Sequence, residues 1–364
     1  LAAWRSAHPE VAERWDVTRG HETPPDLAAR LAEGLEGKPD ATRKHSGAVI
    51  QRIQEQAPFL VGGSADLAGS NNSPIKASGY VGSAGEGEDP FAGSNIHFGV
   101  REHSMAAITN CIALDGTFRP FCATFMVFSD YMRPSLRLAA MMKLPAVFVF
   151  THDSFFVGED GPTHQPVEQL DALRAIPGLT VFRPADGVET AMAWAWALQR
   201  ARGPVALALT RQGVPVLKRE VPFALEDVWK GAYRIREPEG EPDLVLLASG
   251  SEVVLACDAA TDLAAEDVSA RVVSLPSLEL LGEQPESYRR ELLPEEIPVV
   301  AVEAARGESL RGLVGRRGVI QGIDRFGASA PGKRLAEFFG FTPDRLAARI
   351  LEWWRSPASQ KERP

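Results

Sequence analysis

Short runs of β-branched and aromatic residues alternate with longer segments of helical period along most of this chain. Buried parallel strands are continuous apolar runs, and the helices between them are amphipathic, so this alternation is typical of an α/β fold built on parallel sheets. In the first part of the chain we expect strands at 59–62, 96–100, 121–124, 146–151, 180–182 and 205–210. Helices are expected at 46–56, 102–114, 129–142, 167–176 and 188–201.

A second strand and helix series follows residues 218–242, a stretch rich in proline, glycine and charge. Its strands are expected at 244–248, 271–275, 299–302 and 318–322, with helices after Ser251, Leu278, Pro331 and Pro343. A length of 364 residues suits about two ordinary domains. We therefore predict two parallel-sheet α/β domains, divided as a linker segment at 1–40, a domain at 41–217, a linker at 218–242 and a domain at 243–364. Residues 79–87 are expected to form a Gly/Ser/Glu loop.

Charge and cysteine content exclude several partners. Asp and Glu total 48 against 39 Lys and Arg, a net charge of −9, so the chain as a whole repels polyanions and we predict no nucleic-acid partner. The apolar run at 144–150 is far shorter than the roughly 20 residues that span a bilayer, so we predict no membrane partner. Three cysteines without CxxC spacing argue against a disulfide framework and predict a reducing, cytoplasmic location.

Polar residues gather directly after the predicted strands of the first domain, where parallel α/β sheets bind their ligands. His152, Asp160 and His164 follow one buried strand within a short stretch, which favours catalysis or ligand binding. A structural alternative exists, because residues 160–162 also form a good turn and Thr163 could cap the next helix. No HxH or HExxH spacing is present, so we predict no metal ligands in this chain. The strand ends of the second domain carry no comparable cluster.

Arg43 and Lys44 lie just before a predicted helix, where the positive end of the helix dipole repels them. A bound anion would remove this conflict. Together with Arg211, which follows another strand, Arg43 suggests a small phosphorylated ligand, while a solvated surface arginine is the alternative. The aromatic stripe at 125–131 fits either the core or a surface that stacks on a flat heterocycle. Glu102 opens a helix, where a carboxylate is expected anyway.

Several of these segments form one ordered set of motifs between about Thr42 and Phe341. They are GSADL at 63–67 followed by Ser70-Asn71, FGVREH at 98–103, THDS at 151–154, GEDGPTHQP at 158–166, LTRQ at 209–212, ASGSEV at 248–253, RVVSLP at 271–276 and GIDRFG at 322–327. In this order and spacing the chain resembles the transketolase family of thiamine diphosphate enzymes. The resemblance implies a thiamine diphosphate-binding pyrimidine domain followed by a transketolase C-terminal domain.

The resemblance also implies the residues that would hold thiamine diphosphate. Glu102 would hydrogen-bond the aminopyrimidine ring and share a proton with it, which activates the cofactor. Phe128 would stack on that ring. Phe125 and Tyr131 would complete the apolar pocket, with Asp66 nearby.

The substrate would lie beside the cofactor. His164 would contact both the cofactor and the donor sugar, His152 would assist proton transfers, and Asp160 would distinguish the configuration of the acceptor's C2 hydroxyl. The sugar phosphate itself would be held by Arg43, Ser70 and Arg211. Glu102, His152 and His164 are thus the residues that the resemblance implies for catalysis.

The reaction implied is transfer of a two-carbon ketol unit from a ketose phosphate, such as xylulose 5-phosphate, to an aldose phosphate, such as ribose 5-phosphate or erythrose 4-phosphate, in the pentose phosphate pathway. Related thiamine enzymes remain alternatives: dihydroxyacetone synthase, 1-deoxyxylulose 5-phosphate synthase and the β subunit of 2-oxo acid dehydrogenases. A non-catalytic dimerisation module is an alternative from another class, although the polar strand ends argue against it.

Members of this family also carry an N-terminal domain, which binds the diphosphate through a divalent cation, Mg²⁺ or Ca²⁺, with a Gly-Asp-Gly motif and a downstream Asn. Such a segment is not among these 364 residues, the first residue is Leu, and residues 1–40 resemble the linker that follows that domain. We expect the C-terminal part of a longer homodimeric transferase, incomplete by itself, with a separate diphosphate-binding subunit as the alternative.

Overall fold

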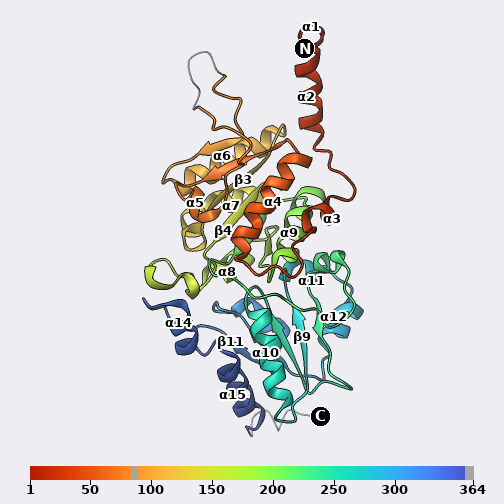
Figure 1. Cartoon of the computed structure of the whole chain (residues 1–364), viewed down its shortest axis with the longest axis vertical. Helices are drawn as coiled ribbons and strands as arrows, with labels where there is room; N and C mark the ends of the chain where they lie inside the picture. The colour runs from red at the N-terminus through yellow and green to blue at the C-terminus, as the bar shows by residue number, and fades with distance from the viewer. Residues whose placement is uncertain (83–88, 357–364) are drawn as a thin grey trace.

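The computed structural model describes residues 1–82 and 89–356. Two α/β units lie one above the other along the long axis, and the helices α1 (Ala2–Ala7) and α2 (Pro9–Gly20) project beyond the first unit (Figure 1). Of the loop predicted at 79–87, residues 83–87 lie outside the described residues. No helix in the described ranges has both the length and the apolar character needed to cross a membrane.

The first unit is built on a sheet of six parallel strands in the order β2-β1-β3-β4-β6-β5. Its strands are β1 (Leu60–Ser64), β2 (Asn95–His97), β3 (Arg119–Phe125), β4 (Val147–Thr151), β5 (Thr180–Phe182) and β6 (Val205–Leu209). Each lies where the sequence predicts a strand. β2 ends earlier than expected, because Gly99 has a φ of 69° and cannot continue an extended run.

Helices cover both faces of this sheet, as the apolar runs require. In β4, Val147 and Val149 pack on one side and Phe148 and Phe150 on the other. The valine side is covered by α3, α4 and α9, and the phenylalanine side by α6, α7 and α8. The helices of this unit are α3 (Leu27–Ala32), α4 (Thr42–Gln56), α5 (Ala68–Asn71), α6 (Glu102–Asp115), α7 (Ser129–Met141), α8 (Gln169–Arg174) and α9 (Gly187–Gln199), with 3₁₀ turns η1 (Met126–Phe128) and η2 (Phe155–Asp160).

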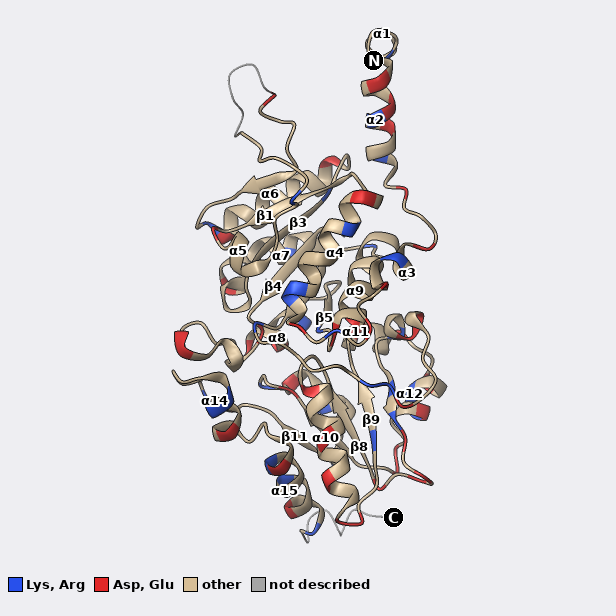
Figure 2. Ribbon diagram, in the orientation of Figure 1, with Lys and Arg blue, Asp and Glu red and all other residues tan. Residues whose placement is uncertain are grey.

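Helix α4 begins at Thr42, four residues before the predicted start at Ser46. The backbone N–H of Thr42 donates to the Thr210 hydroxyl at 2.9 Å, and the backbone N–H of Thr210 donates to the Thr42 hydroxyl at 2.8 Å. These bonds fix the start of α4 against the end of β6. Arg43 is therefore in the first turn of the helix, whereas the sequence predicted it before the helix, and Figure 2 shows a basic start of α4 at the end nearer the second unit.

The second unit has a five-stranded sheet in the order β11-β10-β8-β9-β7, parallel except for β7. Its strands are β7 (Tyr233–Arg236), β8 (Leu244–Ala248), β9 (Ala270–Ser274), β10 (Val299–Val302) and β11 (Val319–Gln321). Its helices are α10 (Glu252–Ala264), α11 (Leu278–Gly282), α12 (Glu286–Leu292), α13 (Arg311–Val314), α14 (Gly332–Phe339) and α15 (Pro343–Trp354), with 3₁₀ turns η3 (Leu225–Lys230) and η4 (Glu308–Leu310). This architecture confirms the predicted pair of parallel-sheet α/β units.

One strand was not expected. β7 lies inside residues 218–242, which the sequence suggests to be a linker, and pairs antiparallel with β9. Tyr233 and Ile235 lie in the core, and the alternating Arg234 and Arg236 are half-buried. This run of four residues is too short to stand out among the surrounding charges. A single apolar cluster continues from the first unit into the second, so the two units share a core.

Candidate active site at the carboxyl edge of the first sheet

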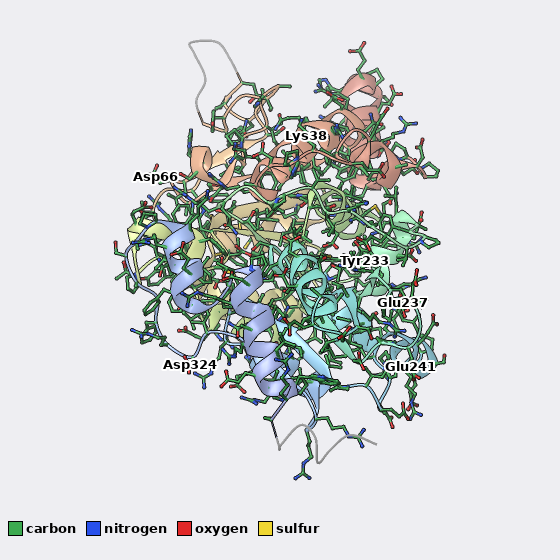
Figure 3. The ribbon with its side chains drawn as sticks, turned by 60° about the horizontal axis from the view of Figure 1, so that its bottom comes forward. Lys38, Asp66, Tyr233, Glu237, Glu241 and Asp324 are labelled. Carbon is green, nitrogen blue, oxygen red and sulfur yellow. The ribbon has the colours of Figure 1, made fainter. Side chains whose placement is uncertain are left out.

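The carboxyl ends of β1, β3, β4 and β6 bring together segments that are far apart in the sequence. Phe125 is the last residue of β3, and Asp66, His152 and Arg211 follow within two residues of the ends of β1, β4 and β6. The four strands are neighbours in the sheet, so their ends form one edge. Asp66 is exposed at the periphery of the unit (Figure 3), with a φ of 59° that sharply turns the chain after β1.

A cavity of about 500 Å³ opens at this edge. This is a typical size for a small-molecule site. It is lined by Ala65, Asp66, Leu67, Val100, Glu102, Phe128, Tyr131 and His164. The half-buried Glu102 is the first residue of α6, and no hydrogen bond or ion pair within 1–82 and 89–356 engages its carboxylate. The cavity thus combines an unpartnered carboxylate with aromatic surfaces.

Aromatic rings connect this cavity to His152. The imidazole of His152 stacks on Phe125 with ring centroids 3.7 Å apart, and Phe125 lies nearly parallel to Phe128 at 6.0 Å. Phe128 in turn meets His164 edge-on at 5.6 Å and Tyr131 at 6.1 Å. Five of the residues named from the sequence therefore form one continuous aromatic wall.

His152 is also held by a chain of polar side chains that sequence reasoning did not assign. The Thr151 hydroxyl donates to Asn71 Oδ1 at 2.7 Å and lies 2.8 Å from His152 Nδ1. The Asn71 amide donates to Ser64 Oγ at 2.9 Å, and all three residues are buried. Asn71 and Thr151 stand inside the recognised motifs, but only the fold shows that they touch. This chain fixes the imidazole at the strand end.

Two arginines, Arg43 and Arg211, lie near His152. The Arg43 guanidinium donates to the Ser70 carbonyl, and its Nε donates to the Arg211 carbonyl at 3.3 Å. Burial, and then the nearby Arg211, lower the pKa of Arg43. Burial also lowers the pKa of His152 to about 3, with Arg43, Arg211 and His164 adding to the effect. A site in which Arg211 disfavours the charge of Arg43, and both arginines disfavour a charge on His152, would stabilise a bound anion.

Some predicted site residues lie outside these contacts. Asp160 is exposed at the end of η2, and within the described ranges it makes no hydrogen bond or ion pair. Ser70 meets Arg43 through its backbone carbonyl, and its hydroxyl makes no hydrogen bond within residues 1–82 and 89–356. In the described part of the chain no three His, Cys, Asp or Glu side chains group as a metal site would.

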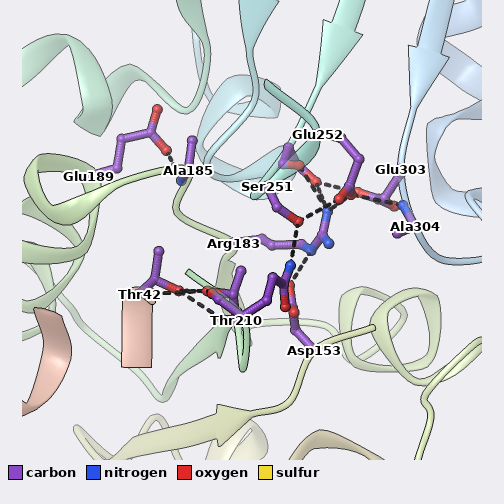
Figure 4. A network of polar contacts seen from close by, with 12 residues as sticks. Thr42, Asp153, Arg183, Ala185, Glu189, Thr210, Ser251, Glu252, Glu303 and Ala304 are labelled. Carbon is purple, nitrogen blue, oxygen red and sulfur yellow. Dashed lines mark hydrogen bonds and ion pairs between the residues drawn. The ribbon is translucent and has the colours of Figure 1, made fainter. Parts of the chain in front are cut away.

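The second unit does carry polar residues at its strand ends, contrary to the expectation from sequence. Ser249 follows β8, Glu303 follows β10, and Glu252 begins α10. All three surround Arg183, which follows β5 of the first unit. Figure 4 shows Arg183 between Glu252 and Glu303 of the second unit and Asp153 of the first, with which it also pairs. Ser249 and Glu252 lie in the ASGSEV motif, but the sequence gives no signal for their contact with Arg183, which stands alone between Phe182 and a proline.

Two family models match the chain over these units. Residues 38–216 match the transketolase pyrimidine-binding domain, and residues 231–342 match the transketolase-like C-terminal domain. A transketolase from Halalkalibacterium halodurans is 46% identical over 350 residues, which are 96% of this chain and 52% of that protein. The chain thus spans about half the length of the curated relatives it matches.

Solved structures agree with this assignment. A transketolase from Pichia stipitis in complex with xylulose 5-phosphate has 35% sequence identity and a TM-score of 0.88, covering 96% of this chain and 51% of that one. A split-gene transketolase described as an inactive β4 tetramer has the same fold, with a TM-score of 0.71 at 24% identity over 89% of this chain and all of that one. The fold and the motifs define a pair of thiamine-enzyme domains. The chain belongs to the transketolase family.

Proposed function

We propose that this chain supplies the aminopyrimidine-binding and sugar phosphate-binding part of a transketolase, which transfers a two-carbon ketol unit from a ketose phosphate to an aldose phosphate. The observation that carries the proposal is the juxtaposition at one sheet edge of the Glu102 cavity and the Arg43 and Arg211 cations. The relative in complex with xylulose 5-phosphate supports that donor. Ribose 5-phosphate and erythrose 4-phosphate are the acceptors proposed, which places the reaction in the pentose phosphate pathway.

The residues present fit thiamine diphosphate. Its aminopyrimidine ring needs an apolar face and a carboxylate at its edge, and the cavity offers Phe128 and Tyr131 for the face and Glu102 for the edge. Phe125 supports Phe128 from behind, and Asp66 and His164 complete the lining. When bound, the cofactor supplies the electron sink that makes cleavage of the ketose carbon–carbon bond possible.

The chain's own residues would then bind the sugar and move protons. Glu102, free of other partners in the described ranges, would hold a proton against the ring. His164, half-buried beside Phe128, would contact the sugar oxygens. His152 is kept neutral by its surroundings, so it is suited to exchange hydrogen bonds with substrate hydroxyls rather than to carry charge. Asp160, exposed on its loop, would contact the acceptor's C2 hydroxyl.

The phosphate would bind where positive charge is uncompensated. Arg43 is oriented by two backbone carbonyls, and it lies in the first turn of α4, whose N-terminus favours an anion. Arg211, exposed after β6, and Ser70 would complete the phosphate contacts. A sugar phosphate would therefore be anchored at one end by Arg43 and Arg211 and reach the cavity with the other.

The remaining elements of the enzyme are also proposals. A diphosphate-binding domain, in the same polypeptide or as a separate subunit, would supply the divalent cation, Mg²⁺ or Ca²⁺. Exposed apolar residues on α6 and α7, among them Ile108, Leu138 and Met141, support a homodimer interface. We place the enzyme in the cytoplasm. We take 41–217 and 243–364 as its two domains here, to which segments 1–40 and 218–242 add α3 on the first sheet and β7 in the second.

Reconstitution tests the function directly. The chain is mixed with the diphosphate-binding domain of a transketolase, thiamine diphosphate and Mg²⁺, and ketol transfer from xylulose 5-phosphate to ribose 5-phosphate is followed by product formation. We expect activity only when both protein parts and the cofactor are present. Transfer to formaldehyde but not to aldose phosphates would instead indicate dihydroxyacetone synthase activity, and binding of the two parts without any transfer would support a non-catalytic module.

A further inference from the structure

Arg183 belongs to the first unit by sequence but is enclosed by the second. It directly follows β5, and its side chain is 1% exposed. Its Nη1 donates to the Ser249 carbonyl at 2.8 Å and to the Ser249 hydroxyl at 3.0 Å, and it also pairs with the Glu252 carboxylate (Figure 4). The Arg183 backbone is bonded in both directions, with its N–H to the Pro276 carbonyl at 2.8 Å and its carbonyl to the Gly250 N–H at 3.0 Å.

The place that Arg183 occupies is the ligand position of the second sheet. From β8 the chain continues to β9 on one side and later returns to β10 on the other, so the strand order reverses between β8 and β10. Open α/β sheets bind ligands outside the carboxyl ends of such strands. Gly250 there has a φ of 58°, and a Cβ on it would lie 2.8 Å from Arg183 Cζ. The second unit is therefore shaped around this guanidinium.

The other side of the guanidinium reaches the candidate active site. Arg183 Nε donates to Asp153 Oδ2 at 2.9 Å, and the Asp153 side chain is fully buried. The second carboxylate oxygen of Asp153 has no hydrogen-bond partner in the described ranges, so Arg183 is the group that holds this side chain. Asp153 directly follows His152, whose φ of 62° is unfavourable for a residue with a Cβ. Such conformations persist only where the surroundings enforce them.

We propose that Arg183 is a positioning residue through which the second unit holds Asp153, and thereby His152, in the geometry that the substrate site requires. This inference rests on the proposed function in one respect, the assignment of His152 to the sugar phosphate site. It gives the second unit a role in the reaction although that unit contributes no residue to the cavity described above. It also explains why the buried guanidinium of Arg183 is kept among the carboxylates of Asp153, Glu252 and Glu303, where an apolar side chain could fill the same space.

The chain offers a matched control. Arg174 is another buried arginine that crosses between the units, with Nη1 2.8 Å and Nη2 2.9 Å from the Glu303 carboxylate and Nη1 3.1 Å from the Ser309 hydroxyl. Within 1–82 and 89–356 no hydrogen bond or ion pair joins Arg174 to Asp153, although its partner Glu303 also accepts from the Ser249 hydroxyl at 2.7 Å. A role limited to joining the two units predicts equal effects on His152 when either arginine is changed. A positioning role predicts an effect only for Arg183.

The test observes His152 itself. Imidazole Cε1–Hε1 NMR signals of the full chain are recorded during titration with inorganic phosphate, and the His152 signal is assigned by its loss in His152→Gln. We expect the wild type and Arg174→Gln to give the same His152 signal and the same phosphate Kd. Arg183→Gln should shift or broaden that signal before phosphate is added and weaken the phosphate Kd at least tenfold. Arg183→Lys, which keeps the charge but not the planar fork, should fall between them.

The opposite results overturn the inference. If the His152 signal of Arg183→Gln has the wild-type position and width, and its phosphate Kd is within twofold of the wild type, Arg183 only joins the units. Should Arg183→Gln not fold, Asp153→Asn takes its place, because it removes the ion pair while keeping the side-chain size, and an unchanged His152 signal is again contradictory. If phosphate leaves the wild-type His152 signal unaffected, the proposed phosphate site is wrong, while the signals without phosphate still decide the role of Arg183.

Discussion

The imidazole of His152 lies flat against the ring of Phe125, with centroids 3.7 Å apart and an angle of 25° between the planes. Phe125 ends β3, where its register partner is Thr151, the last residue of the neighbouring β4, and His152 directly follows Thr151. The parallel register of the two strands therefore brings the two rings together. Together with the Thr151 hydroxyl at Nδ1, this stacking fixes both the plane and the rotation of the imidazole.

Burial of His152 predicts a specific acid sensitivity. Its pKa in the folded chain, about 3, is below the ordinary value of 6.5, because burial and the nearby cations disfavour the charged form. The stabilisation due to the neutral imidazole is therefore complete above about pH 6.5 and is lost as the pH falls towards 3. We expect the free energy of unfolding to fall less steeply between pH 6 and 4 in His152→Gln than in the wild type. The difference between the two slopes should be up to about one kcal/mol per pH unit. Urea unfolding at several pH values measures this, and parallel slopes for the two proteins would contradict it.

Arg211 should affect phosphorylated substrates selectively. A charge-assisted hydrogen bond to phosphate is worth about 1.5–3 kcal/mol, so Arg211→Ala should raise the KM for ribose 5-phosphate at least tenfold in the reconstituted enzyme. The KM for the unphosphorylated acceptor glycolaldehyde should stay within about twofold. Arg202→Ala is the control, since Arg202 is an exposed arginine before the same strand, at the opposite edge of the sheet. Equal losses with both acceptors would count against a phosphate contact.

Gly62 should be essential for the pairing of β1 with β3. A Cβ at this position would lie 2.1 Å from the Phe121 carbonyl oxygen, a backbone atom that cannot move without breaking the sheet. We expect Gly62→Ala to lower the free energy of unfolding by about 3 kcal/mol, the upper range for overpacking. Gly69→Ala, where a Cβ would meet nothing within 4 Å, should change it by less than about 0.5 kcal/mol. Chemical denaturation of both variants tests this register of β1 with β3. Wild-type stability of Gly62→Ala would contradict it.

The fold and the site could be predicted from sequence to different extents. The six strands of the first unit were predictable because apolar runs such as 147–151 are buried on both faces and interrupted by clear turn signals. Strand β7 was not, because its two core residues alternate with arginines in a charged segment. The start of α4 was placed too late because its first turn is stabilised by Thr210, a residue 168 positions away.

For the site, residue types next to strand ends identified the participants, and the resemblance suggested their roles. What sequence could not provide were contacts between side chains of different strands. Neither the link from Asn71 through Thr151 to His152 nor the pairing of Arg183 with Asp153 has a local pattern. Both depend on the strand order of the sheet and on how the second unit packs against it, which no spacing along the chain encodes.

Glu102 provides the most direct test of the account. The test uses the enzyme completed with a diphosphate-binding domain, thiamine diphosphate and Mg²⁺. The rate of ketol transfer from xylulose 5-phosphate to ribose 5-phosphate is compared for the wild type, Glu102→Gln and Glu55→Gln. Glu55→Gln is the control, because Glu55 is an exposed glutamate near the far end of α4. We predict that Glu102→Gln lowers kcat at least about 100-fold while Glu55→Gln has no effect, since only Glu102 is placed to exchange a proton with the cofactor. Ketol transfer by Glu102→Gln within twofold of the wild-type rate would contradict the assigned site.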